Sequence, residues 1–88
     1  MIVPVELFAA AAASLGRTTD ALELPDGAVL GDLMDALGTR AARTDDPANA
    51  AAVLARCTYL VAGVATSDRD APLTAGDAVD VLPPFSGG

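Results

Sequence analysis

The sequence IVPVELF, residues 2–8, indicates the fold more clearly than any other stretch of the chain. Its odd positions, Val3, Val5 and Leu7, are apolar, and a period of two residues is typical of a β-strand with one buried face. Phe8 falls on the opposite face. Pro4 has no N–H to donate, so we expect it where no neighbouring strand needs one. This stretch therefore predicts a first strand whose odd residues face the core.

The pattern of apolar residues on either side of short turns predicts the remaining elements. Helices are expected over residues 9–15, closed by Gly16, over residues 29–37, with Gly38 at or near the end, and from a cap at Asp46. Strands are expected over residues 18–24, 58–64 and 78–82, and 58–64 is apolar enough to be buried on both faces. Residues 39–45 form a loop with no assignable motif. This order predicts an α+β fold, with a mixed sheet in which the first and last strands are neighbours and the helices cover one face.

Charge and composition exclude several classes of function. The chain of 88 residues carries a net charge of −7, with twelve acidic residues against five arginines and no lysine. Such a surface repels phosphate backbones and anionic lipids, so we expect a basic protein partner rather than nucleic acid or a membrane. Without histidine, and with Cys57 as the single thiol, the side chains for a metal site or a nucleophilic dyad are missing. The lack of a signal peptide or a membrane-length apolar run favours a cytoplasmic protein.

The chain ends in VLPPFSGG, residues 81–88, and this segment has two interpretations. Pro83 and Pro84 cannot pair in a sheet and hold a fixed φ, so residues 83–88 can form a stiff extension that reaches at most about 20 Å. Gly87 and Gly88 have no Cβ, so they could enter a slot too narrow for other residues. In the alternative, the segment is a frayed terminus that happens to end in glycine.

Strand alternation also predicts a surface next to this segment. If Val79 and Val81 face the core, Leu82 points outward on the same face as Phe8. Exposed apolar clusters usually mark contacts with partners, so Phe8 and Leu82 form a candidate partner interface. In the alternative, a loop covers both side chains.

Three segments together resemble a known family: VELFAAAAASLG, VLGDLMDAL and AGDAVDVLPPFSGG. They are similar, in order and over nearly the whole chain, to the small subunit of molybdopterin synthase, a ubiquitin-like sulfur carrier of the MoaD/ThiS family. The resemblance implies a β-grasp domain over residues 1–82 and an extended Gly-Gly tail over residues 83–88.

The resemblance also implies a function for the tail. An E1-like (MoeB-like) adenylyltransferase would use ATP to adenylate the carboxylate of Gly88, and a sulfur donor would convert it to a thiocarboxylate. The tail would then enter a MoaE-like large subunit, in a heterotetramer that builds the dithiolene of molybdopterin. Gly87 would permit this entry, and Pro83, Pro84, Phe85 and Ser86 would set the reach and line the channel. The chain would bind no cofactor and would have no activity alone.

Two alternatives to this function stay open. Related carriers that end in Gly-Gly deliver sulfur for thiamin, cysteine or natural-product synthesis. A β-grasp protein modifier would instead form isopeptide bonds with target lysines.

Overall fold

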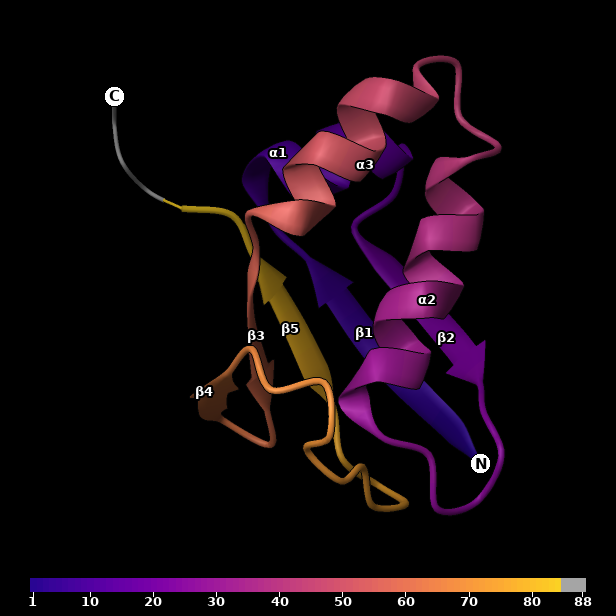
Figure 1. The fold of residues 1–88 in the computed structure, drawn as a ribbon, viewed down its shortest axis with the longest axis vertical. Coiled ribbons are helices and arrows are strands. Elements are labelled where there is room, and N and C mark those ends of the chain that lie inside the picture. The colour runs from indigo at the N-terminus through magenta and orange to yellow at the C-terminus, as the bar shows by residue number, and fades with distance from the viewer. Residues whose placement is uncertain (85–88) are drawn as a thin grey trace.

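The computed structural model describes residues 1–84 and contains a five-stranded mixed sheet. The strands are β1 (Ile2–Leu7), β2 (Thr19–Glu23), β3 (Thr58–Val61), β4 (Val64–Thr66) and β5 (Val79–Leu82). Their order across the sheet is β2-β1-β5-β3-β4, and only the central pair, β1 and β5, is parallel. The predicted adjacency of the first and last strands in a mixed sheet is confirmed (Figure 1).

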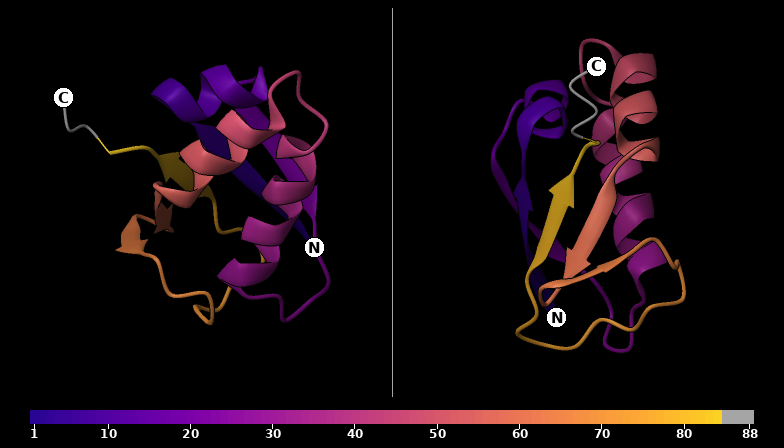
Figure 2. Two further views of the ribbon diagram at one scale, coloured as in Figure 1. Left: turned by 45° about the horizontal axis from the view of Figure 1, so that its top comes forward. Right: turned by 90° about the vertical axis from the view of Figure 1, so that its left-hand side faces the viewer.

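Three helices accompany the sheet: α1 (Ala9–Leu15), α2 (Leu30–Ala41) and α3 (Pro47–Ala55). In the right-hand view of Figure 2, α2 and α3 lie on one side of the sheet, with α1 at its upper end. Gly16 closes α1 in the left-handed conformation (φ 71°), which favours glycine. The Asp46 carboxylate accepts a hydrogen bond from the Asn49 N–H and so caps α3 as predicted.

The core lies between the helices and the sheet. Its largest fully buried side chains come from α2, β1 and β5: Leu30, Leu33, Leu37, Val3, Val5, Val79 and Val81. The odd residues of β1 therefore face the core, as the period of two predicts. None of the helices within residues 1–84 is long and apolar enough to cross a membrane.

The prediction of one strand over residues 58–64, buried on both faces, is wrong. The chain turns back at Ala62 and Gly63, whose φ angles are 48° and 83°, and forms the antiparallel hairpin β3–β4. A two-residue loop with both φ angles positive matches the twist of the strands, but its usual sequences are Asn-Gly and Asp-Gly. Because alanine, rather than asparagine or aspartate, stands at the first position, the sequence does not predict this turn. Only Tyr59 is fully buried in this hairpin, whereas Val64 is exposed.

The prediction that α2 ends near Gly38 is also wrong. The helix continues to Ala41, which is buried, so the predicted loop 39–45 begins three residues too early. A glycine inside a helix costs about 1 kcal/mol relative to alanine. Burial of Leu37 and Ala41 on the same helix face outweighs that local preference.

Pro4 lies where the sequence predicts it, at a position that needs no donor. The even residues of β1 direct their N–H groups toward β5, as Phe8 does when it donates to the Val81 carbonyl (3.2 Å). Pairing with β5 begins opposite Val5, so Pro4 lies outside the paired segment.

Candidate functional site at the end of the central strand

Strand β5 fixes the position from which the C-terminal segment leaves the domain. It pairs with β1 from Val79 to Val81 and with β3 from Val79 to Leu82. The side chains of Val79 and Val81 have no exposed surface. Hydrogen bonds on both edges and apolar contacts on the inner face therefore hold the strand as far as Leu82.

The chain leaves the sheet at two prolines, and their environments differ. Pro83 is buried, whereas Pro84 is exposed. Figure 1 shows this segment leaving the sheet at the end where α1 and α3 lie. Because neither proline can donate to a strand, sheet pairing through their N–H groups stops here. The predicted tail residues Phe85, Ser86, Gly87 and Gly88 lie outside the described residues, and the roles predicted for them stay predictions.

Phe8 and Leu82 lie side by side on the sheet face opposite α2 and α3. Leu7 pairs with Val81 in the parallel register, so the next residues, Phe8 and Leu82, are neighbours as well. Phe8 is 36% exposed and Leu82 is half-buried. An apolar pair thus borders the exit of the chain, and its predicted contact with a partner stays a prediction.

The backbone of Phe8 is held firmly on both sides of its side chain. Its N–H donates to the Val81 carbonyl (3.2 Å), and its own carbonyl accepts from the N–H groups of Ala11 (3.0 Å) and Ala12 (3.4 Å). Ala9, which follows, has a φ of 49°, a region that alanine seldom adopts. These constraints fix the backbone of Phe8 and the direction of its Cα–Cβ bond.

The structure adds Leu60 to this surface, which the sequence analysis did not identify. Thr58 pairs with Leu82 and Leu60 pairs with Asp80, so Leu60 lies diagonal to Leu82 on the outer face. Leu60 is half-buried. Tyr59 and Val61 lie on the inner face of β3, so alternation along the strand places Leu60 on the outer face. The sequence did not predict this position because the strand was expected to be buried on both faces. We call Phe8, Leu60 and Leu82 the outer apolar patch.

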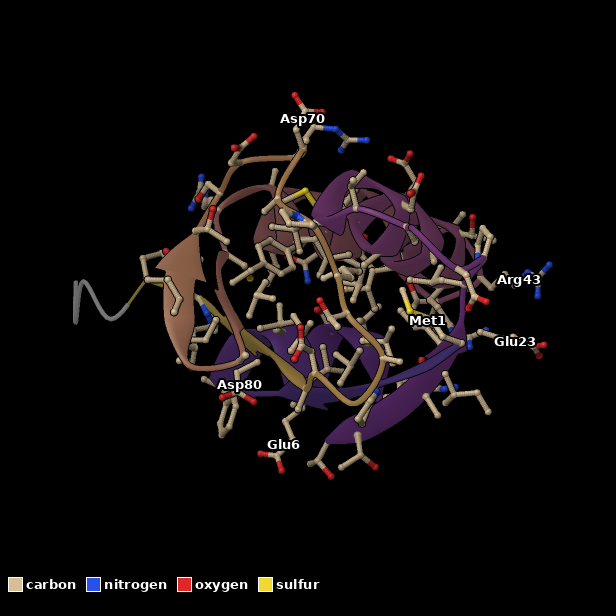
Figure 3. All side chains as sticks on the ribbon, turned by 90° about the horizontal axis from the view of Figure 1, so that it is seen from below. Met1, Glu6, Glu23, Arg43, Asp70 and Asp80 are labelled. Atoms are coloured by element: carbon tan, nitrogen blue, oxygen red, sulfur yellow. The ribbon has the colours of Figure 1, made fainter. Side chains whose placement is uncertain are left out.

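Carboxylates lie immediately beside the outer apolar patch. Glu6 and Asp80 are register partners on β1 and β5, on the same face as Phe8 and Leu82 and two positions before them along each strand. Figure 3 shows both side chains pointing away from the helices. A partner that covers the patch would therefore have to bring cations toward this rim.

The reactive side chains near the exit are not arranged for chemistry of their own. Burial raises the pKa of the Cys57 thiol, whose S–H donates to the Val53 carbonyl (3.2 Å). Burial, followed by the nearby Cys57, raises the pKa of Tyr59 to about 12. Both groups are thus protonated at neutral pH. Within residues 1–84, no three potential metal ligands gather.

This topology, a parallel central strand pair with helices on one face, is the β-grasp fold. Small archaeal modifier protein 1 from Haloferax volcanii has the same fold, with a TM-score of 0.79, 27% identity and coverage of 100% of both chains. The complex of subunits 1 and 2 of the molybdopterin-converting factor from Helicobacter pylori contains a chain with a TM-score of 0.69 and 22% identity, again with 100% coverage of both chains. At that identity, the second likeness concerns the fold alone.

Sequence comparison assigns the family. The profile of the ThiS family matches residues 5–88, and the chain belongs to this family. A search of curated proteins gives no significant match. The chain is thus a ubiquitin-like sulfur carrier of the ThiS/MoaD type or a modifier of the archaeal type.

Proposed function

We propose that the chain is the sulfur carrier subunit of a molybdopterin synthase and carries sulfur as a thiocarboxylate on Gly88. The observation that carries this proposal is the exit of the chain from β5. The strand is fixed through Leu82, two prolines follow, and the outer apolar patch lies at the same end of the sheet. The segment that carries the Gly-Gly sequence therefore begins at a rigid support, beside a surface suited to docking.

The proposed reaction has two steps. An E1-like adenylyltransferase joins the Gly88 carboxylate to the AMP part of ATP, and pyrophosphate leaves. A sulfur donor then displaces AMP, so that sulfur replaces one carboxylate oxygen. Gly87 and Gly88 suit these steps because residues without Cβ let another protein's backbone close around the chain. Pro83, Pro84, Phe85 and Ser86 provide the reach into a partner's channel.

The outer apolar patch is the proposed docking surface for both partners, the adenylyltransferase and the synthase large subunit. Phe8 and Leu82 supply its apolar contacts together with Leu60, while Glu6 and Asp80 select a partner with a basic rim. The net charge of −7 supports the same choice of partner. Use of ATP by the first partner would place the cycle in the cytoplasm.

The choice of the molybdopterin pathway rests on likeness to the small subunit, and binding of the large subunit tests it. The Helicobacter pylori structure is a complex of subunits 1 and 2 of the molybdopterin-converting factor, and we propose the equivalent partner here. Mixing the chain with the large subunit from the same organism should give a complex on size-exclusion chromatography. If no complex forms, the carrier belongs to another sulfur pathway, such as that of thiamin or cysteine.

A second candidate function is protein modification, favoured by the 27% identity over the full length of the Haloferax modifier. In that case the activated Gly88 would be attacked by a lysine amine of another protein. The chain itself has no lysine, so adducts between its own copies through lysine are excluded. Lysine-linked adducts on other proteins in the native host, found by mass spectrometry of tryptic peptides, would favour this function over sulfur transfer.

Intact mass spectrometry tests the sulfur carrier directly. The chain is incubated with its adenylyltransferase, ATP and a sulfur donor, and we expect a mass increase equal to the exchange of one oxygen for sulfur. A variant lacking Gly88 should show no increase, whereas Asp26→Asn, an exposed residue beside Met1 at the opposite end of β1 from the chain exit, should show the full increase. An increase that persists without Gly88 would place the sulfur elsewhere and overturn the proposal.

A further inference from the structure

Strand β2 forms one edge of the sheet, away from the outer apolar patch and the chain exit. Its even residues bond to β1, as the hydrogen bonds of Thr18 with Leu7 and of Leu24 with Met1 show. By the alternation of an antiparallel pair, the N–H and C=O groups of Thr19, Ala21 and Glu23 point away from β1. An edge of this kind can pair with an added strand.

The outward N–H of Ala21 is already satisfied within the chain. It donates to the carboxylate of Asp20 at 2.8 Å. The outward N–H and C=O groups of Thr19 and Glu23 and the carbonyl of Ala21 therefore remain directed at solvent within the described residues. An added strand would find backbone partners at both ends of β2.

A shallow groove runs beside this edge, between β2 and α2. It has a volume of about 460 Å³ and is lined by Ala21, Leu22, Glu23, Ala36, Thr39 and Arg40. The side chains of Ala21 on β2 and Ala36 on α2 are small, so the groove has room for the side chains of an added strand. We call this feature the β2 groove.

Arginine side chains gather at the start of β2, where the β2 groove ends. The side chain of Asp20 is only 7% exposed; its carboxylate accepts a hydrogen bond from Nε of Arg40 (2.7 Å) and forms an ion pair with Nη1 of Arg17 (3.3 Å). Burial alone would raise the pKa of Asp20, but the Arg40 hydrogen bond, the Ala21 N–H and both arginine charges lower it overall. One ionised carboxylate thus holds two partly exposed guanidinium groups in place.

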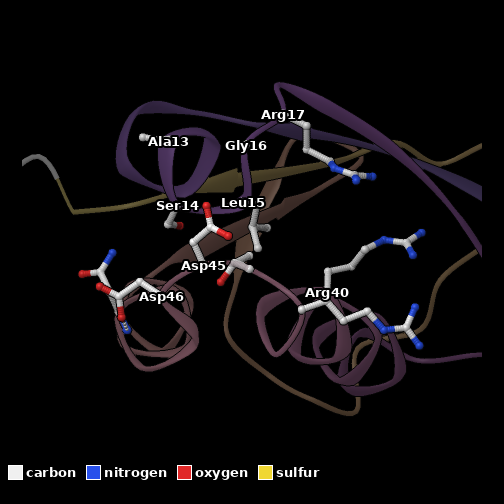
Figure 4. A pocket seen from close by; sticks show the side chains of 11 residues that line it. Ala13, Ser14, Leu15, Gly16, Arg17, Arg40, Asp45 and Asp46 are labelled. Atoms are coloured by element: carbon white, nitrogen blue, oxygen red, sulfur yellow. Dashed lines mark hydrogen bonds between the residues drawn. The ribbon is translucent and has the colours of Figure 1, made fainter.

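These arginines gather on one side of a cavity whose other side is lined by Asp45 and Asp46, and two of them share the single carboxylate of Asp20. Arg17, Arg40 and Arg43 line an open cavity of about 530 Å³, and they are three of the five basic residues of the sequence. In Figure 4 the side chains of Arg17 and Arg40 extend to the same side, away from Asp45 and Asp46. The charge and the edge together indicate what kind of partner fits.

We propose that the β2 groove binds an extended peptide segment of a partner protein, paired antiparallel with β2 and carrying acidic residues at its C-terminal end. Antiparallel pairing brings that end to the start of β2, beside Arg17 and Arg40. Backbone bonds at Glu23 and Ala21 would provide affinity, and side chains in the groove and at the arginines would provide specificity. This proposal does not depend on the function of the C-terminal tail.

Nuclear magnetic resonance of the full-length, ¹⁵N-labelled chain tests the proposal. The probe is the synthetic peptide acetyl-Gly-Thr-Val-Thr-Val-Thr-Glu-Glu-amide. We expect saturable shifts of the amide signals of residues 19–23 and 36–40, and weaker binding at high salt. Arg17→Ala should weaken binding about two- to fivefold, as expected for one partly exposed ion pair. The matched control, Arg56→Ala, removes an arginine at the end of α3 and should leave binding unchanged.

A second pair of variants tests the backbone pairing itself. Glu23→Pro removes an outward N–H without breaking a bond to β1, and proline is tolerated on edge strands. It should weaken peptide binding about tenfold, the loss expected for one backbone hydrogen bond and its geometry. Glu23→Ala keeps the N–H and should bind at least as well as the parent. Equal binding by both variants, or shifts confined to the outer apolar patch, would overturn the proposal. Shifts of residues 19–23 that depend on protein concentration without peptide would assign the edge to a second copy instead, which also overturns it.

Discussion

Val81 and Leu82 are consecutive residues of β5, and they face opposite environments. Val81 is fully buried under the helices, whereas Leu82 lies half-buried on the outer face beside Phe8 and the chain exit. The inner face of the sheet maintains the fold, and the outer face is available for a partner. Alternation along one strand therefore separates the residues that determine stability from those proposed to determine docking.

The largest effect on stability is expected from the inner face. Val81→Ala should lower the free energy of unfolding by about 2 kcal/mol, because it removes two buried methyl groups and leaves a cavity. Leu82→Thr keeps a side chain suited to strands and should cost less than about 1 kcal/mol. Urea denaturation of both variants measures the difference. Equal losses would show that the two faces are not separated in this way.

Asp20 is the charged residue on the inner side of the sheet, and its loss should have the next largest effect. Asp20→Asn should cost about 1–2 kcal/mol at neutral pH, because two charge-assisted hydrogen bonds to Arg40 are weakened. Glu6→Gln, a change of the same kind on the outer face, should have little effect.

The dependence of stability on pH gives a second measure for Asp20. Its pKa in the folded chain lies below the ordinary value of 3.8, so its contribution is present above that value and is lost as pH falls through the folded pKa. Between about pH 5 and pH 1 the parent should therefore lose more stability than Asp20→Asn. Parallel losses in the two proteins would contradict the ion-paired arrangement of Asp20.

The smallest effect concerns two glycines of α2 that lie in different surroundings. At Gly38 an added Cβ would meet open space, so Gly38→Ala should raise the free energy of unfolding by about 1 kcal/mol. At Gly31 an added Cβ would lie 3.1 Å from the Arg69 carbonyl oxygen, which accepts the Gly31 N–H. Gly31→Ala should therefore gain nothing. Thermal unfolding distinguishes them, and no gain at Gly38 would contradict a helix that continues through it.

Much of the fold could be predicted because burial and local pattern agree along most of the chain. The odd residues of β1, the glycine that closes α1 and the Asp46 cap each have a local cause that is visible in the sequence. At Gly38, tertiary burial of Leu37 and Ala41 overrides the local preference. At Ala62 the hairpin uses a residue that seldom adopts positive φ.

The candidate site could be predicted in part for the same reason. Phe8 and Leu82 follow from alternation on two strands, whereas Leu60 required the register between β3 and β5. The pairing of Asp20 with Arg40 joins residues 20 positions apart. Contacts of this kind are set by how the elements pack, and local sequence patterns do not reveal them.

The rate of thiocarboxylate formation in Phe8→Ser tests most directly whether the outer face serves docking rather than folding. Phe8 is the N-cap of α1 with an extended backbone, a position that serine favours, so capping should offset part of the burial that the partly exposed phenyl ring loses, and the variant should cost less than about 1 kcal/mol. The measurement follows sulfur incorporation by intact mass, with the adenylyltransferase below saturation, beside urea denaturation of the same protein. We predict incorporation at least about tenfold slower, with a loss of unfolding free energy below about 1 kcal/mol, which leaves the protein folded in the assay. Incorporation at the parent rate, or a fall in stability large enough to explain the slower rate, would contradict the account.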